Sequence, residues 1–128
     1  PGVDLPVVGF CRSKFGEYPE YHTSADDLSL VSPEGLQGAY DVMTQVIDAL
    51  EMNQSYQVQV LCEPQLGKRG LYPTTSQKGS YDKVTAMVDF IAYADGKTDL
   101  IDISNKIGIP VSELIAVIKQ LNNANLIK

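Results

Sequence analysis

Cysteine is scarce in this chain of 128 residues, which contains only Cys11 and Cys62. Two cysteines are too few for a disulfide scaffold, and their separation excludes a Cys-x-x-Cys zinc or redox pair. We expect both thiols to stay reduced, as thiols do in the cytoplasm. Because unpaired cysteines are usually buried, each is expected to be a small apolar residue beside a strand.

Long apolar runs are also missing. No stretch approaches the ~20 residues that span a bilayer, and the first residues lack the basic and hydrophobic regions of a signal peptide. The sequence therefore favours a soluble cytoplasmic protein with no membrane partner. It has no initiator Met and enters an apolar run almost at once, so we expect a missing upstream part or a trimmed N-terminus.

Positive charge is the minority, with a formal net charge of -6 and a pI near 4.6. Nucleic acids and anionic membranes are bound by clustered Lys and Arg, so both are disfavoured as partners. From residue 80 onward the chain has no arginine, and it has five lysines and six acidic residues. Direct reading of guanine favours arginine, which makes nucleic acid an unlikely partner for this part.

The first half of the chain has an α/β pattern. Residues 5–10 form a continuous apolar run that predicts a buried strand, and residues 11–31 predict a long polar loop at its carboxyl end. Ser32, Pro33 and Glu34 predict the start of a helix that continues to about Met52. One face of that helix carries a stripe of five apolar residues, Leu36, Tyr40, Met43, Ile47 and Leu50.

A second strand is predicted at residues 56–61, where apolar and glutamine residues alternate strictly. Glycines and prolines then enforce an irregular segment that ends in a soft linker at residues 74–79. We place a domain boundary at that linker. The expected organisation is an α/β domain segment at residues 1–78 and a second, smaller domain at residues 80–128.

The smaller domain is predicted to contain three helices, at residues 81–94, 100–107 and 111–122, followed by a short terminal strand. The first helix is expected to turn Val84, Met87, Val88 and Ile91 inward. This order is typical of a winged helix, whose second and third helices form a helix-turn-helix. The outward face of the third helix carries one lysine and one glutamate, which favours a protein partner over DNA.

The single histidine, His22, lies in the polar loop beside several carboxylates. Zinc binds neutral imidazole, and a nearby carboxylate such as Asp26 could orient the ring through its other nitrogen. One histidine cannot make a catalytic site by itself. On the residues alone, a solvated loop histidine is the more frequent case, and Asp26 could equally form an Asx turn or a cap.

Two sequence motifs favour a metal ligand over a solvated loop histidine at position 22. Residues 21–26 read Tyr-His-Thr-Ser-x-Asp, and residues 62–73 read Cys-Glu-Pro-Gln-Leu-Gly-Lys-Arg-Gly-Leu-Tyr-Pro. Together they resemble the C-terminal part of bacterial aminopeptidase-like proteins of the zinc exopeptidase superfamily, which also carry a C-terminal winged-helix-like lobe. The resemblance implies a fold that is an α/β remnant of a zinc-exopeptidase-like domain plus a small winged-helix lobe.

The same resemblance implies chemistry. His22 would be the late metal ligand of a zinc-dependent hydrolase that acts on a peptide-like or amide substrate, and Asp26 would orient its ring. The other ligands and the general base would lie upstream, so this chain alone is expected to be inactive. The alternative is a non-catalytic protein-interaction module built on an acidic winged helix.

Three further residues are candidates for substrate binding. Arg12 and Tyr21 flank the loop and could hold a substrate carboxylate or stack on a substrate side chain. Arg69 could do the same, or it could lock the irregular segment by pairing with Glu63 or another neighbour. A serine hydrolase is not indicated, because no Gly-x-Ser-x-Gly elbow or similar signature accompanies the serines near His22.

Overall fold

A computed structural model describes residues 2–72 and 80–128, without the side chains of residues 80–83. The chain divides into two compact units, residues 1–44 and 45–128, and each is described by itself. The linker predicted at residues 74–79 lies outside the described residues.

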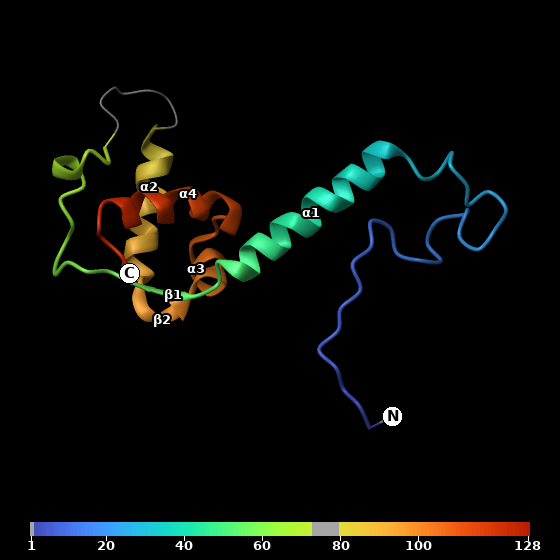
Figure 1. Cartoon of the computed structure of the whole chain (residues 1–128), viewed down its shortest axis with the longest axis horizontal. Helices are drawn as coiled ribbons and strands as arrows, with labels where there is room; N and C mark the ends of the chain where they lie inside the picture. Colours follow the sequence, from blue (N-terminus) through green and yellow to red (C-terminus); the bar gives the residue numbers. More distant parts are fainter. Residues whose placement is uncertain (1, 73–79) are drawn as a thin grey trace. The chain divides into compact units, whose positions relative to one another are not determined.

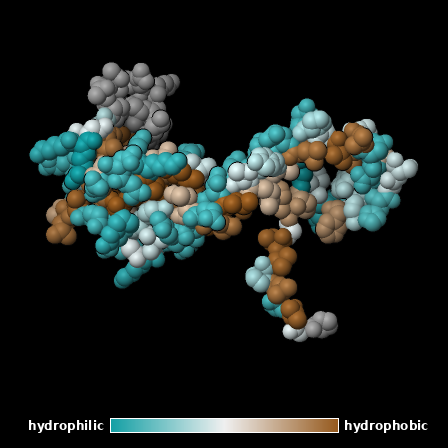
Figure 2. Space-filling model, in the orientation of Figure 1, coloured by the Kyte–Doolittle hydropathy of each residue, from teal (hydrophilic) through white to brown (hydrophobic). Residues whose placement is uncertain are grey.

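The predicted strand at residues 5–10 is wrong: these residues have no regular secondary structure. Their apolar side chains are open to solvent, and Val8 is 89% exposed. Figure 2 shows this segment as a row of hydrophobic residues. A strand needs a neighbour to satisfy its backbone groups, and the described residues of the first unit contain no other strand. The loop predicted at residues 11–31 is confirmed as a succession of turns and bends.

The long helix predicted after Ser32 is confirmed as α1, Pro33–Glu51. The Ser32 hydroxyl oxygen accepts the Gly35 N–H at 3.0 Å, as expected of an N-cap. The predicted apolar stripe is not covered, since Leu36 is 63% exposed and Leu50 is 61% exposed. The sequence pattern therefore specifies an apolar helix face that the described residues do not bury.

The second unit contains the end of α1 and then β1 (Ser55–Gln57), the 3-10 helix η1 (Gly67–Arg69), α2 (Ser80–Tyr93), β2 (Asp95–Asp99), α3 (Leu100–Ile107) and α4 (Val111–Asn123) (Figure 1). The three predicted helices are confirmed. The Asp99 carboxylate caps α3 by accepting the Asp102 N–H at 2.9 Å, and Gly108 ends it in the left-handed conformation. In the described part of the chain, no helix combines the length and apolar character needed to cross a bilayer.

A small antiparallel sheet joins β1 to β2, with Ser55 opposite Asp99 and Gln57 opposite Asp95. Val58 also bridges to Ile127, so the predicted terminal strand is present as a single antiparallel bridge. The strand predicted at residues 56–61 is shorter in the structure, Ser55–Gln57. Its predicted alternation is confirmed, because Tyr56 is buried while Gln57 and Gln59 are exposed. Strand β2 was not predicted. Its sequence, Asp-Gly-Lys-Thr-Asp, lacks the β-branched and aromatic residues that mark strands.

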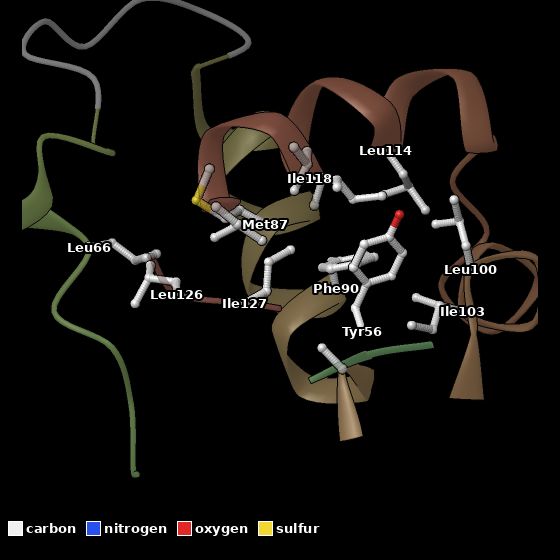
Figure 3. Packing of buried hydrophobic residues seen from close by; sticks show 14 residues of the cluster. Tyr56, Leu66, Met87, Phe90, Leu100, Ile103, Leu114, Ile118, Leu126 and Ile127 are labelled. Carbon is white, nitrogen blue, oxygen red and sulfur yellow. The ribbon is translucent and has the colours of Figure 1, made fainter. Parts of the chain in front are cut away.

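One hydrophobic core holds this unit together, built from side chains of β1, α2, α3 and α4 together with Leu66, Ala94, Leu126 and Ile127 (Figure 3). Tyr56 is 1% exposed and Leu66 is 3% exposed, so both belong to the core of the C-terminal helices although they precede residue 80. This core therefore includes residues on both sides of the predicted boundary, and the domain limits of 1–78 and 80–128 stay a prediction. On α2, Met87 and Phe90 are buried, whereas Val88, which was expected to face inward, is 41% exposed.

Both cysteines are free and exposed, so the expectation that they are buried is wrong. The expectation depended on a strand beside Cys11, which is absent, and on burial at the end of β1. Cys62 instead lies beyond β1 with a φ of 64°, in the left-handed region, where the chain turns away from the sheet.

Candidate functional site

The loop around His22 is a chain of short turns stabilised by local hydrogen bonds. Backbone N–H groups of Glu17, Tyr21 and Thr23 each donate to the carbonyl oxygen three residues earlier, at 3.1, 3.3 and 3.0 Å. The Thr23 hydroxyl donates to the Glu20 carbonyl oxygen at 2.8 Å and accepts the Ala25 N–H at 3.2 Å. These bonds give the His22 loop a defined backbone path without a helix or a strand.

His22 stands at the exposed surface of this loop. Its φ is 57°, in the left-handed region that residues other than glycine adopt infrequently. Its imidazole packs edge-on against the Tyr21 ring, with centroids 4.2 Å apart and an interplanar angle of 63°. The ring is therefore held on one side by an aromatic neighbour and is open to solvent on the other.

Tyr21 is the centre of an aromatic cluster. Its ring lies 5.7 Å from that of Tyr18 and 6.1 Å from that of Phe15, in addition to its contact with His22. Such contacts stabilise an exposed loop by burying part of each ring. The predicted substrate contact of Tyr21 remains a prediction, and the structure gives this residue a packing role beside the histidine.

The carboxylates near His22 do not gather around it. Among the hydrogen bonds of the described residues, none joins Asp26 to the imidazole, and Asp26 is exposed. Asp27 accepts the Ser29 N–H at 2.7 Å, and hydrogen bonds from the Ser29 hydroxyl and N–H lower its carboxyl pKa. Within residues 2–72 and 80–128, no three His, Cys, Asp or Glu side chains form a group that could hold a metal ion. Among the described residues, His22 is therefore not part of a ready-made group of metal ligands.

Arg12 is placed against the first turns of α1. Its Nη2 donates to the Gly35 carbonyl oxygen at 2.9 Å. A Cβ at position 38 would lie 2.7 Å from Nη2, so Gly38 is what allows the guanidinium to lie this close to the helix. Phe10, Cys11, Arg12, Gly38, Ala39 and Val42 line a cavity of about 320 Å³ at this junction. Gly38 was not predicted to have a role, although a glycine inside an otherwise regular helix is a signal of close approach.

Arg69 is placed in the second unit, where its Nη1 donates to the Ala124 carbonyl oxygen at 3.1 Å, just past the end of α4. A cation at this end of a helix is favourable, because the unpaired carbonyl groups carry partial negative charge. Arg69 was predicted either to bind substrate or to lock the irregular segment by pairing with a neighbour such as Glu63. This contact resembles the second role, with a backbone carbonyl as the partner in place of Glu63. It leaves the substrate role of Arg69 as a prediction.

The outward face of α4 has the residues that the sequence predicted. Ser112, Glu113, Ala116, Lys119 and Gln120 are all exposed, and Leu114, Ile118 and Leu121 are buried on the opposite side. The exposed face therefore presents one positive and one negative side chain. Lys106 of α3 lies over the Tyr93 ring, with its ammonium nitrogen 5.7 Å from the ring centroid.

Comparison with known proteins divides the chain near residue 54. Residues 1–53 match a family model described as a domain of unknown function. A protein of Clostridium acetobutylicum, provisionally named as a polysaccharide biosynthesis protein with an aminopeptidase-like domain, is 36% identical over 130 residues. That match covers 100% of this chain and 30% of the relative.

The chain is also similar to a solved structure of a protein from the same organism. The crystal structure of a protein from Clostridium acetobutylicum, provisionally described as a peptidase, superposes with a TM-score of 0.68 at 34% sequence identity, covering 84% of this chain and 23% of that one. The chain thus spans less than a third of the length of these relatives. Residues 54–128, more than half of the chain, match a family model described as winged helix-turn-helix. Through these residues, the chain belongs to the winged helix-turn-helix family.

Proposed function

We propose that this chain is the C-terminal part of a zinc-dependent aminopeptidase-like hydrolase, to which His22 contributes a late metal ligand. The observation that carries the proposal is the 36% identity along the entire chain to a protein whose name includes an aminopeptidase-like domain. The relative is about three times as long as this match, so it has room for a catalytic domain in addition to the matched part.

The environment of His22 supports the proposal. Its imidazole is exposed, and the turns on either side hold it in a left-handed backbone conformation next to Tyr21. A neutral imidazole with a free edge is a good zinc donor, and the remaining donors would come from residues outside this chain. In that assembly Asp26 would orient the ring through its second nitrogen, once the loop brings the two side chains together.

Two exposed apolar surfaces support the larger assembly. Residues 5–10 and the apolar stripe of α1 are uncovered, and Val7 alone is 80% exposed. Exposed runs of this kind are uncommon on a self-sufficient domain, because leaving apolar side chains in water forfeits about 25 cal/mol per Å². Both surfaces are suited to burial in a larger α/β domain, where residues 5–10 could regain the strand that their sequence predicts.

The chemistry proposed for the whole protein is hydrolysis of a peptide-like or amide substrate in the cytoplasm. Bound zinc would supply Lewis acidity toward the substrate carbonyl and lower the pKa of water. The part proposed for this chain is to donate an imidazole at one fixed point and to supply Arg12 and Tyr21 as substrate contacts. The general base would lie outside this chain, so the chain by itself is proposed to be inactive.

The test is metal-dependent hydrolysis by the longer polypeptide that the proposal requires. Its activity on leucine p-nitroanilide would be lost in 1,10-phenanthroline and restored by zinc. A His22→Ala variant would not recover with zinc, whereas a Ser24→Ala variant, altered at an exposed neighbour, would recover fully. Recovery of His22→Ala to the level of Ser24→Ala would overturn the ligand assignment.

A second candidate function is a non-catalytic protein-interaction module. It is favoured by the outer face of α4, where Lys119 is the only cation among five exposed residues. That face is poorly suited to phosphate groups and better suited to a protein. The two functions are compatible, because they involve different units of the chain.

A further inference from the structure

Two adjacent hollows lie on either side of Glu63 and Pro64 in the second unit. The first, of about 190 Å³, is bordered by Glu63 and lined by apolar and thiol side chains from Cys62, Pro64, Leu66, Val88, Ile91 and Ala92. The second, of about 430 Å³, is lined by Val60, Glu63, Pro64, Gln65, Lys68 and Arg69. We call these two hollows together the Pro64 surface.

The apolar hollow has anchored walls. Leu66 is 3% exposed and belongs to the core, and its backbone is fixed by a hydrogen bond from its N–H to the Pro64 carbonyl oxygen at 2.8 Å. Ile91, on the α2 side, packs against the same core. Val88 is 41% exposed and leaves the hollow open. A preformed apolar site avoids part of the entropy cost of ordering when a ligand binds.

The size of the apolar hollow restricts what it can hold. Pockets for whole small molecules or cofactors measure roughly 300–1,000 Å³. At about 190 Å³, this hollow is smaller and suits a single aliphatic side chain presented by a longer molecule. The neighbouring hollow then offers room for the polar group that follows that side chain.

The charges of the neighbouring hollow favour an anion. Lys68 and Arg69 contribute two positive charges and Glu63 one negative charge, in a chain whose net charge is -6. Lys68 is exposed and, among the described residues, makes no ion pair. Arg69 keeps its charge while it donates to Ala124. This local excess of positive charge is complementary to a carboxylate.

We propose that the Pro64 surface binds a segment of a partner protein that presents an aliphatic side chain next to a carboxylate. The aliphatic side chain fills the hollow between Pro64 and Val88, and the carboxylate lies beside Lys68. The surface involves neither His22 nor its loop, so this interaction does not depend on the metal proposal. The proposed partner of the winged helix is therefore a protein segment that has an aliphatic residue next to an acidic residue.

The probe is the blocked tetrapeptide acetyl-Ser-Leu-Asp-Ser-amide, titrated into the ¹⁵N-labelled whole chain and followed by NMR. Saturable shifts are expected for the amides of Ile91, Ala92 and Lys68. Two matched peptides, with Lys in place of Asp or Ser in place of Leu, are expected to bind more weakly. No saturable shift, or equal binding of either matched peptide, would overturn the proposal.

Two variants at exposed positions locate the site on the chain. Val88→Asp is expected to weaken binding at least about tenfold, because it places a charge in the apolar hollow. Lys68→Glu, at an exposed position, is expected to weaken binding about threefold, as for an exposed charge pair. The matched controls Lys119→Glu and Leu36→Asp are expected to bind like the unaltered chain. Equal losses in the controls would contradict the assignment of the site.

Discussion

Tyr56 of β1 and Phe90 of α2 pack edge to face in the core of the second unit, with ring centroids 5.6 Å apart and an interplanar angle of 63°. Both rings are almost fully buried. The Tyr56 hydroxyl donates to the Met52 carbonyl oxygen at 3.1 Å, so the same side chain also ties β1 to the end of α1. The winged helix therefore requires residues well before residue 80.

Replacing Tyr56 tests this requirement. Tyr56→Ala is expected to lower the free energy of unfolding of the second unit by about 3–5 kcal/mol, because it leaves a cavity beside Phe90. Tyr56→Phe keeps the ring and loses only the hydrogen bond, so it should cost about 1 kcal/mol. Urea unfolding followed by far-ultraviolet circular dichroism measures both. Equal small losses for the two variants would show that Tyr56 is not part of this core.

The helices of the second unit could be predicted from the sequence because local signals define their ends. Asp99 caps α3 and Gly108 terminates it, and both signals are visible without tertiary information. Strand β2 could not be predicted in the same way. Its five residues are polar, and they are held in the sheet by pairing with a strand that lies some forty residues earlier.

The expectation at residues 5–10 was wrong for a related reason. The run has the composition of a buried strand, but a strand needs a neighbouring strand to pair its backbone groups. No such strand is present among the described residues of its unit. The His22 loop was also only partly predictable from the sequence. The Tyr-His-Thr-Ser-x-Asp string could be found in the sequence, yet the left-handed backbone at His22 and the contact between Arg12 and Gly35 depend on the folded loop.

Asp95 makes stability depend on pH. Its carboxylate accepts the Thr98 and Lys97 N–H groups, each at 2.8 Å, and these bonds lower its pKa below the ordinary value. A depressed folded-state pKa contributes stability above the unfolded-state pKa, and this contribution is lost as the pH falls through the folded-state value. Asp95→Ala should therefore be less stable than the unaltered chain at pH 7, with the difference shrinking in acid.

Thermal unfolding of both proteins between pH 7 and pH 2 measures this effect. Asp102→Ala, at an exposed position in the first turn of α3, is a useful control carboxylate. A difference between Asp95→Ala and the unaltered chain that stays constant down to the lowest pH would contradict the role given to these hydrogen bonds.

Arg69 is predicted to hold the irregular segment against the end of α4. Arg69→Ala removes the bond to the Ala124 carbonyl oxygen and is expected to cost about 0.5–1 kcal/mol locally. Native-state hydrogen exchange of the Leu71 N–H, which donates to the Leu66 carbonyl oxygen at 3.0 Å, should become faster. Lys68→Ala is the matched control, and acceleration of the same size in that variant would remove the special role of Arg69.

The charge of residues 80–128 predicts weak interaction of these residues with DNA. From residue 80 onward there is no arginine, and the outer face of α4 has one lysine. We expect no retention of the chain on immobilised duplex DNA at an ionic strength of about 0.15 M, where non-specific binding depends on many phosphate contacts. Retention that weakens steeply with added salt would contradict this expectation.

Zinc stoichiometry shows whether His22 binds metal in the longer polypeptide. The longer polypeptide and its His22→Ala and Ser24→Ala variants would be purified in parallel, dialysed against metal-free buffer and analysed by inductively coupled plasma mass spectrometry. We expect Ser24→Ala to keep the zinc content of the unaltered protein and His22→Ala to lose bound zinc. Zinc content in His22→Ala equal to that of Ser24→Ala would contradict the metal role of His22.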